Sequence, residues 1–284
     1  TDYPLRELCN YIDWTPFFRT WELKGTYPKI LEDQIMGETA RNLFTDAERL
    51  LEQIVDKRLL TAKAVVGFWP ANSVGDDIEV HESGDPIHRQ AILHTLRQQM
   101  RQGRGKANFA LADFIAPLTC QRVDYIGGFA VCVGFGLGEL VAEFEKSHDD
   151  YNAIMARALA DRLAEAFAER MHERVRTELW GYSKNENLSK EELIREQYQG
   201  IRPAPGYPAC PDHSEKKTLF DLLEVEKKIG IKLTENYAMW PAAAVSGFYF
   251  SHPQSRYFGV SKIERDQVEN YARRKNMNTV EVEK

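Results

Sequence analysis

The sequence has few cysteines, no long apolar run and no excess of positive charge. Only four of its 284 residues are cysteines and none form a CxxC pair, which predicts reduced thiols in a cytoplasmic protein rather than a disulfide framework. The longest apolar stretch, residues 127–140, is broken by glycines and is too short to span a bilayer. A net charge of −6 provides no general attraction for nucleic acid or anionic lipid. We therefore expect neither nucleic acid nor a membrane among its partners.

The two ends of the chain lack the features of a complete secreted protein. The N-terminal stretch TDYPLRELCNYIDW has neither the basic nor the apolar region of a signal peptide, and it does not begin with methionine. Near the other end, Asn278 and Glu281 resemble the start of a capped helix that has room for only one turn. We expect residues 1–284 to form one domain that was taken from a longer multidomain chain.

Helix and strand signals follow one another in an irregular order. The clearest helix spans about residues 149–179, which contain neither glycine nor proline and carry apolar residues at helical spacing. Further helices are expected at 86–102, at 214–229, after the capping pair Thr45 and Glu48, and after the capping pair Ser189 and Glu192. Strands are expected at 63–69, 77–82, 123–134, 244–251 and 257–263. Because helices and strands do not alternate regularly, we predict an α+β fold with an antiparallel sheet rather than a doubly wound α/β fold.

A glycine-rich turn follows the strand expected at 123–134. Gly134, Gly136 and Gly138 form a GxGxG pattern like that of dinucleotide-binding turns. Such a site also needs a second parallel strand that ends in an acidic residue about 20 residues further on. The sequence that follows Gly138 is helical in character throughout, so a turn that closes the sheet is the favoured interpretation.

Four polar residues of the long helix share one helical face. Asp161, Glu165, Glu169 and His172 are spaced at i, i+4, i+8 and i+11, as the ligands of a metal site in a helical bundle would be. No second Glu-x-x-His motif accompanies them. Neighbouring arginines stand close enough for i,i+3 and i,i+4 ion pairs, so spacing alone favours a solvated face.

Other chemistry-bearing patterns are incomplete. Cys210 and His213 would supply half of a zinc site, but no second pair of ligands stands at suitable spacing. No GxSxG motif occurs, and no cysteine has an evident histidine partner. The sequence therefore gives no sign of a nucleophile with its general base.

The segment from Arg202 to Tyr207 and beyond, RPAPGYPACP, is rich in proline. Proline restricts the backbone, so such a segment holds its peptide groups in place at low entropic cost. Arg202 at its start offers a planar fork for a carboxylate, and Tyr207 offers an amphipathic ring. A ligand-binding segment and a stiff linker between two helices are equally compatible with this composition.

This segment, IRPAPGYPACPDHSEK, closely resembles the signature of the reactivation domain of cobalamin-dependent methionine synthases, with the motif Arg-x-x-x-Gly-Tyr. The resemblance covers essentially the whole chain. It includes, in order, YIDWTPFF (11–18), ALADRLAEAFAE (158–169), EQYQGIRPAPGYP (196–208), AMWPAAAVSGFYFSHPQSRYFGV (238–260) and RDQVENYARRKNM (265–277). It implies a single domain with a bent antiparallel sheet and flanking helices.

The resemblance also implies a function. The full enzymes of this family transfer a methyl group from methyltetrahydrofolate to homocysteine through cobalamin. When the cobalamin becomes oxidised to cob(II)alamin, the reactivation domain presents S-adenosylmethionine, and a flavodoxin or similar flavoprotein reductant supplies one electron. The cobalamin belongs to a neighbouring module of the same full-length chain, and zinc belongs to the homocysteine module. Since these modules are absent here, this chain is not expected to make methionine alone.

Nine residues acquire expected roles through the resemblance. Arg202 matches the arginine that holds the ligand carboxylate, and Asp13 matches the aspartate that faces its ammonium group. Tyr207 matches the motif tyrosine beside the methionine and ribose parts. Ala209 and its neighbours are expected to present backbone groups to the adenine.

The other five lie at the groove and at the cobalamin-facing side. Tyr257 and Phe258 match an aromatic pair that lines the groove, with the second hydroxyl lost here, and we expect the sheet to carry both. Glu196 is expected to add a polar contact. Asp161 matches an acid that bonds the displaced cobalt-ligand histidine, and Glu165 accompanies it, which replaces the solvated interpretation of these two residues.

One stretch departs from the family pattern, and two other functions remain open. VGFGLGEL is less acidic than expected, with Glu139 as the candidate replacement. A free-standing S-adenosylmethionine-dependent methyltransferase would require a doubly wound fold around Gly134 or an acceptor pocket with a general base. A non-catalytic module that senses S-adenosylmethionine is the other alternative.

Overall fold

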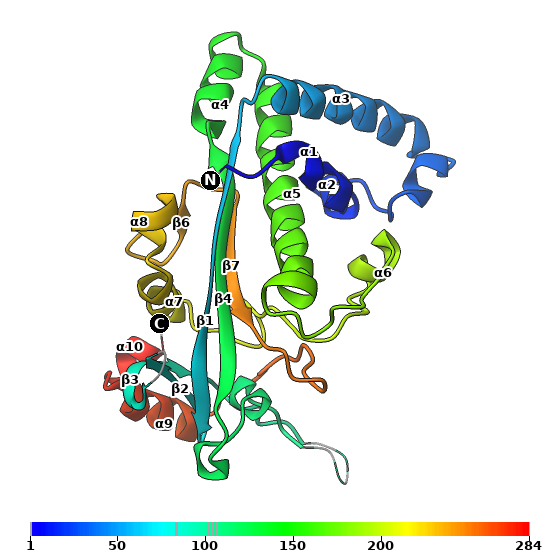
Figure 1. The fold of residues 1–284 in the computed structure, drawn as a ribbon. Coiled ribbons are helices and arrows are strands. Elements are labelled where there is room, and N and C mark those ends of the chain that lie inside the picture. Colours follow the sequence, from blue (N-terminus) through cyan, green and yellow to red (C-terminus); the bar gives the residue numbers. More distant parts are fainter. Residues whose placement is uncertain (1, 83–84, 102, 104, 106, 284) are drawn as a thin grey trace.

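A computed structural model describes residues 2–82, 85–101, 103, 105 and 107–283. Its centre is a five-stranded sheet in the order β3-β2-β1-β4-β7, in which every neighbouring pair is antiparallel (Figure 1). The strands are β1 (Thr61–Val74), β2 (Asp77–Glu82), β3 (Asp85–His94), β4 (Asp124–Phe135) and β7 (Ala244–Tyr249). The predicted α+β fold with an antiparallel sheet is confirmed.

Helices cover both faces of the sheet. Figure 1 shows α5 (Asp150–Arg174) and α3 (Gly37–Asp56) on one side, with α7 (Glu215–Leu223) and α8 (Val225–Ile229) on the other. Alternate residues of β4 divide between these layers: Phe129 and Val131 pack under α5, whereas Ala130 and Cys132 pack toward α7. Both faces of β4 are therefore buried, which explains its almost continuous apolar sequence.

The helix α5 is buried on nearly all sides. Thirteen of its 25 residues are buried, and many of these are alanines, which let neighbouring elements approach closely. Asp149 caps its start, because the Asp149 side chain accepts a hydrogen bond from the Asn152 backbone N–H at 3.0 Å. At its other end α5 continues into a π-helical turn, η5 (Val175–Leu179). The helix predicted for 149–179 is thus confirmed in extent.

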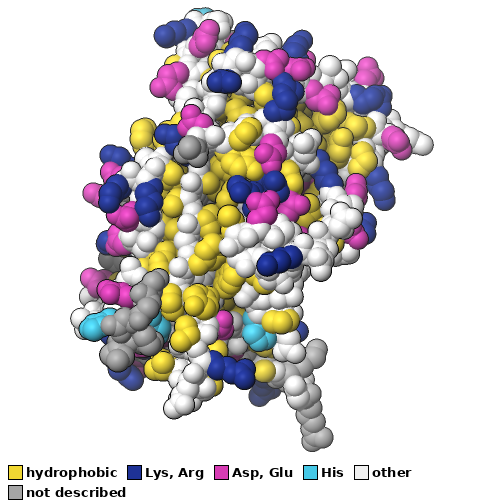
Figure 2. Space-filling view, in the orientation of Figure 1, with side chains coloured by type: hydrophobic (Ala, Val, Ile, Leu, Met, Phe, Trp, Pro, Cys, Tyr) yellow, Lys and Arg dark blue, Asp and Glu magenta, His cyan; other side chains and the backbone are white. Residues whose placement is uncertain are grey.

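The remaining elements are short. They are α1 (Leu5–Leu8), η1 (Cys9–Tyr11), α2 (Thr15–Thr20), η2 (Lys29–Glu32), η3 (Leu111–Phe114), η4 (Leu118–Cys120), α4 (Leu137–Lys146), α6 (Lys190–Ile194), β5 (Lys232–Leu233), β6 (Met239–Trp240), α9 (Arg265–Lys275) and α10 (Thr279–Val282). Figure 2 shows hydrophobic side chains along the middle of one face, and charged side chains of both signs around α3 and α4. No described helix is long and apolar enough to cross a membrane.

Two predicted elements and one predicted helix start are wrong. Within the stretch expected to form a helix at 86–102, residues 86–94 belong to β3 and residues 95–101 form neither helix nor strand, while residue 102 lies outside the described residues. Pairing with β2 overrides the helix propensity of residues 86–94. The Thr45–Glu48 pair does not cap a helix, since α3 begins at Gly37 and Thr45 Oγ1 donates to the Arg41 carbonyl inside it. The capping box at Ser189 and Glu192 is confirmed by both of its hydrogen bonds.

The third error concerns the end of the sheet. Residues 257–263 form no strand, so the prediction that the sheet carries Tyr257 and Phe258 is wrong. The position beside the end of β7 is taken by residues 201–203 instead. Ile201 and Phe250 exchange backbone hydrogen bonds of 3.0 Å in both directions, and the Phe248 N–H donates to the Pro203 carbonyl at 2.9 Å.

The glycine-rich turn serves packing rather than a nucleotide. Both neighbours of β4 run antiparallel to it, so the parallel strand that a dinucleotide site requires is absent from the sheet in the described residues. A β-carbon at Gly134 would lie 1.8 Å from the Ala242 carbonyl oxygen, and Gly136 has a φ of +92° at the start of α4. This geometry supports the predicted turn and also removes the doubly wound methyltransferase alternative.

Candidate functional site

Arg202 is held at the edge of the sheet by its neighbours in the chain. Ile201 and Pro203 pair with the last residues of β7 and the bridge beyond it, so the backbone around Arg202 is extended. Pro203 has no N–H of its own and contributes only its carbonyl to this pairing. The backbone N–H of Arg202 donates to the Tyr257 hydroxyl at 3.0 Å. The stiffness predicted from the prolines therefore places Arg202 against the C-terminal part of α5.

The guanidinium of Arg202 contacts three side chains. Its Nη2 donates to Oε2 of Glu169 at 2.7 Å. Its Nη1 donates to the Tyr198 hydroxyl at 2.9 Å and lies 3.2 Å from Nδ1 of His172. The side chain is 17% exposed, and no described residue accepts a hydrogen bond from Nε. One edge of the guanidinium is therefore still available to a ligand.

The charges and burial around Arg202 set the protonation states of Arg202 and His172. Burial opposes the charged form of Arg202, but the Glu169 carboxylate holds the pKa of the guanidinium well above its ordinary value. His172 is fully buried, and burial together with Arg202 and Arg176 holds its pKa well below the ordinary range. A neutral His172 has a lone pair on Nδ1 to accept from Arg202, which leaves its proton on Nε2, 3.5 Å from the Tyr182 hydroxyl.

Glu196 lies within electrostatic reach of the same guanidinium. Its surroundings raise the pKa of the Glu196 carboxyl by burial, and the positive charge of Arg202 opposes that increase. The φ of Glu196 is +55°, a backbone conformation that ends the short helix α6 and starts the loop toward Arg202. The structure thus brings Glu196, Tyr257 and Arg202 together.

Asp13 lies at the junction of η1 and α2. Its Oδ1 accepts a hydrogen bond from the Thr15 backbone N–H at 2.9 Å. The segment before it is attached to α5, because the Tyr11 hydroxyl donates to Oε2 of Glu173 at 2.6 Å. Glu169 and Glu173 are one helical turn apart, so this turn of α5 holds both Arg202 and the segment that carries Asp13.

A tight turn carries Tyr207 and Ala209. The Gly206 N–H donates to the Cys210 carbonyl at 2.7 Å, and the Cys210 N–H donates to the Tyr207 carbonyl at 2.9 Å. Tyr207 is 61% exposed, whereas Ala209 is 4% exposed and belongs to the core on the α7 side of the sheet. The tyrosine ring is therefore presented outward by a turn that is anchored in the core.

Phe258 points away from Arg202. Its ring packs near Phe109 and Phe114, with ring centroids 6.2 and 6.3 Å apart. Tyr257 instead accepts a hydrogen bond from the Arg202 backbone N–H. The structure does not place the two aromatic rings on the same side.

Asp161 and Glu165 lie on an outer part of α5. Both are exposed, and neither has a hydrogen-bond or ion-pair partner in the part of the chain that the structure describes. Desolvation raises the pKa of Asp161, and the nearby Arg162 opposes this. Glu165 borders a cavity of about 320 Å³ that is also lined by Ala204 and Tyr207. The structure therefore places Glu165 beside the Tyr207 turn.

The solvated-face interpretation fails for the second half of the same helical face. Glu169 is 14% exposed, and His172 is fully buried. The fully buried Arg176 pairs with Glu186 at 2.7 Å rather than with solvent. No group of three or more histidine, cysteine or acidic side chains among the described residues is arranged to hold a metal ion.

Three residues that contact Arg202 had not been assigned to the site from the sequence. Glu169 and His172 already shared a helical face with Asp161, which was the available signal, but the face gave no indication of burial. Tyr198 stands four residues before Arg202, within the family-like segment 196–208 but outside the Arg-x-x-x-Gly-Tyr motif. Its role becomes visible only when the loop and α5 are seen to meet.

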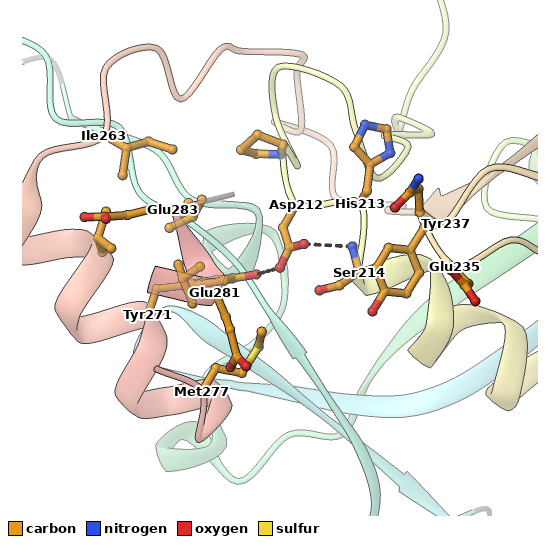
Figure 3. Close-up of a pocket in the computed structure, with 15 residues that line it drawn as sticks. Asp212, His213, Ser214, Glu235, Tyr237, Ile263, Tyr271, Met277, Glu281 and Glu283 are labelled. Carbon is orange, nitrogen blue, oxygen red and sulfur yellow. Dashed lines mark hydrogen bonds between the residues drawn. The ribbon is translucent and has the colours of Figure 1, made fainter. Parts of the chain in front are cut away.

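A separate cavity of about 660 Å³ lies near the C-terminal helices (Figure 3). Figure 3 shows Asp212 between Tyr271 and Ser214; the Tyr271 hydroxyl donates to Asp212 at 2.8 Å, and the Ser214 N–H donates to it at 2.7 Å. Lys275 bonds the same carboxylate at 2.6 Å. These polar groups satisfy one another, so they tie α9 to the loop that follows the Tyr207 turn.

Comparisons with known proteins agree with this geometry. Residues 4–276 match the family model described as vitamin B12-dependent methionine synthase, activation domain. A solved structure described as the MetH reactivation domain bound to AdoHcy is 58% identical in sequence, with a TM-score of 0.96. The match covers 100% of this chain and 87% of that one.

Proposed function

Because the chain belongs to the family of vitamin B12-dependent methionine synthase activation domains, we propose that it binds S-adenosylmethionine at the Arg202 edge. The observation that carries this proposal is the guanidinium of Arg202, which is mostly buried yet retains donors that no described side chain uses. A planar fork of this kind matches a carboxylate in a bidentate arrangement. The AdoHcy reported for the similar solved structure also has an amino-acid end with such a carboxylate.

The other groups required by a sulfonium amino acid lie around this edge. Asp13 is proposed to face the ammonium group, since its segment is attached to the turn of α5 that holds Arg202. Tyr207 is exposed at the end of the motif that Arg202 begins, and it would cover the methionine and ribose parts. Backbone groups near Ala209 are proposed to meet the adenine.

Three residues have more specific parts in this proposal. The Tyr257 hydroxyl accepts a hydrogen bond from the Arg202 backbone N–H, and this contact is proposed to fix the position of the Arg202 Cα, from which the side chain extends. Glu196 supplies negative charge near the positive sulfonium or ammonium group. Phe258 supports the adenine side of the turn through the core that it shares with Ala209, rather than as one of a pair of rings in the groove.

The reaction proposed for this domain is the transfer of the sulfonium methyl group to a cobalamin of a neighbouring module. A cobalamin held by that module would supply the methyl acceptor, a flavodoxin-type reductant would supply the one electron required, and S-adenosylhomocysteine would be left on this chain. The residues of this chain have to bind and align the methyl donor, and no proton has to be moved. The absence of a nucleophile with its base from the described site is compatible with such a displacement.

The outer part of α5 is proposed as the cobalamin-facing side. Asp161 and Glu165 have free carboxylates, and Glu165 borders the cavity beside Tyr207. We propose that Asp161 accepts a hydrogen bond from the histidine that leaves cobalt in the cobalamin module. Glu139, at the start of α4, has no proposed part in this contact.

Calorimetric titration of residues 1–284 with S-adenosylmethionine and S-adenosylhomocysteine tests the proposal. Both ligands should bind at one site, because both carry the amino-acid end and the nucleoside. Adenosine alone, which lacks the amino-acid end, should bind far more weakly. Failure of both amino-acid ligands to bind, or equal affinity for adenosine, would contradict it.

A further inference from the structure

We propose that Glu169, His172 and Tyr198 are positioning residues that fix the guanidinium of Arg202 and decide which of its edges meets the ligand carboxylate. The inference rests on the proposed function, because it concerns how Arg202 is held for that carboxylate. None of the three residues has to touch the ligand itself. Together they would restrict the orientation of the Arg202 guanidinium.

The hydrogen bonds of the guanidinium support this division of labour. An arginine side chain has five N–H donors in a rigid plane. Two on Nη1 are directed to Tyr198 and His172, and one on Nη2 is directed to Glu169. The donors that remain are Nε–H and one hydrogen on Nη2. These are neighbouring donors, and together they make the side fork that a single carboxylate accepts.

The positioning residues are themselves fixed. Cζ of Arg176 lies 4.1 Å from the centroid of the Tyr198 ring, and the fully buried Arg176 is held by Glu186. The His172 ring stacks on Tyr249 with centroids 5.2 Å apart. Three contacts thus hold Arg202 from behind, and those from Tyr198 and His172 are supported by a further layer of buried side chains.

Glu169 lies between two arginines but bonds only one of them. Its Oε2 is 2.7 Å from Nη2 of Arg202, whereas its Oε1 is 3.9 Å from Nη1 of Arg176. Oε1 and that Nη1 are both buried and have no hydrogen-bond partner in the described part of the chain. The Glu169 carboxylate is therefore positioned to bond Arg202, and this position leaves it too far from Arg176 for a hydrogen bond.

The experiment compares two ligands that differ only in the carboxylate: S-adenosylmethionine and its decarboxylated analogue. Tyr198→Phe removes one acceptor from Nη1 and, with it, the hydrogen bond between the Tyr198 and Tyr257 hydroxyls. Both contacts act on Arg202, so the variant should lower the affinity for S-adenosylmethionine by roughly 2- to 12-fold. The affinity for the decarboxylated analogue should not change. Tyr151→Phe is the matched control, because it removes a tyrosine–carboxylate hydrogen bond to Asp46 at the other end of α5. It should leave both affinities unchanged.

Glu169 provides a second, independent variant. Glu169→Ala removes the acceptor and the charge, and it should lower the affinity for S-adenosylmethionine by at least about tenfold. Glu169→Gln keeps an acceptor for Nη2 and should recover part of the loss. Circular dichroism melts identify the temperature at which each variant is folded. If Glu169→Ala does not fold, Tyr198→Phe still decides the question.

The outcomes separate the two levels of the proposal. Unchanged affinities in Tyr198→Phe, or equal losses for both ligands, would overturn the positioning role while wild-type binding still supports the proposed function. Equal affinity of the wild-type chain for the two ligands would overturn the carboxylate role of Arg202 itself, and the positioning role with it. Losses confined to S-adenosylmethionine support both.

Discussion

The imidazole of His213 fills the space beside Gly206. A β-carbon on residue 206 would lie 2.1 Å from Cε1 of this ring, and Gly206 has a φ of +95°. Nδ1 of His213 accepts a hydrogen bond from Lys216 Nζ at 2.7 Å, which keeps the ring in place. The turn that presents Tyr207 is therefore shaped by close packing against one histidine as well as by its backbone conformation.

Gly206→Ala should consequently destabilise the turn. Its backbone conformation and the contact with His213 both disfavour a β-carbon, so we expect a loss of about 1–3 kcal/mol in the free energy of unfolding, measured by urea denaturation. The double variant Gly206→Ala with His213→Ala removes only the steric part and should recover some of the loss. Gly138→Ala is the control, because a β-carbon there meets no atom within 4 Å. Gly206→Ala with wild-type stability contradicts this view of the turn.

Lys275 should be a major contributor to stability. Its Nζ lies 2.6 Å from Asp212 and 2.7 Å from Glu215, and Glu215 is 2% exposed. Lys275→Ala leaves a buried carboxylate without its cation, so we expect a loss of about 3–5 kcal/mol in the free energy of unfolding.

Lys217→Ala is the control for the Lys275 variant in the same urea denaturation experiment. The Lys217–Asp221 pair is exposed on both sides, so its loss should change stability by less than about 1 kcal/mol. Equal effects of the two substitutions would show that burial of the Lys275 cluster contributes nothing.

His172 should make stability depend on pH below about 6.5. The pKa of His172 is depressed in the folded state by burial, Arg202 and Arg176, whereas the unfolded chain has an ordinary histidine pKa of about 6.5. Above that pH both states are neutral at this site. Below it the unfolded state binds a proton that the folded state does not, so stability falls as pH falls.

Comparing wild type with His172→Gln at pH 7.5 and 5.5 measures this effect. The wild-type chain should lose about 1.4 kcal/mol more than the variant between the two pH values, because only the wild type contains the titrating group. Urea denaturation at each pH provides the free energies. Identical pH dependence in the two proteins would mean that His172 accepts a proton in the folded state.

Long, regular elements could be predicted from the sequence, and elements that depend on a distant partner could not. The run without glycine or proline at 149–179 predicted α5 and its continuation. Residues 86–94 have helix-forming side chains, but the hydrogen bonds of β2 decided their structure. Residues 257–263 have a strand-like composition, but residues 201–203 make the backbone hydrogen bonds at the end of β7 that a further strand would need.

The site was predictable where local chemistry marks it. Arg202 and Tyr207 stood out because prolines and a glycine surround them. Glu169 looked like any other acid on a charged helical face, since periodicity shows which residues share a face but not what covers it. Only the fold brings the 201–203 segment over this part of α5 and buries Glu169 and His172.

Asp161→Asn should affect the full-length enzyme but not ligand binding by this domain. Asp161 is exposed and has no partner among the described residues, so the S-adenosylmethionine affinity of residues 1–284 should stay nearly intact. In the full-length enzyme, loss of a charge-assisted hydrogen bond worth about 1.5–3 kcal/mol should reduce the form in which histidine has left cobalt about tenfold or more. The visible spectrum of cob(II)alamin reports that ligation. A spectrum and a reductive methylation rate equal to those of the wild type would contradict the proposed hydrogen bond from the histidine to Asp161.

The most direct test of the central claim is the affinity of Arg202→Ala for S-adenosylmethionine, measured by calorimetry at a temperature where circular dichroism shows it to be folded. The substitution removes a charge-assisted fork, so the affinity should fall by about 10- to 150-fold, which corresponds to about 1.5–3 kcal/mol. Arg202→Lys keeps the charge but lacks the planar fork, and it should recover only part of the loss. An Arg202→Ala affinity equal to that of the wild type would contradict the assignment of Arg202 as the carboxylate-binding residue.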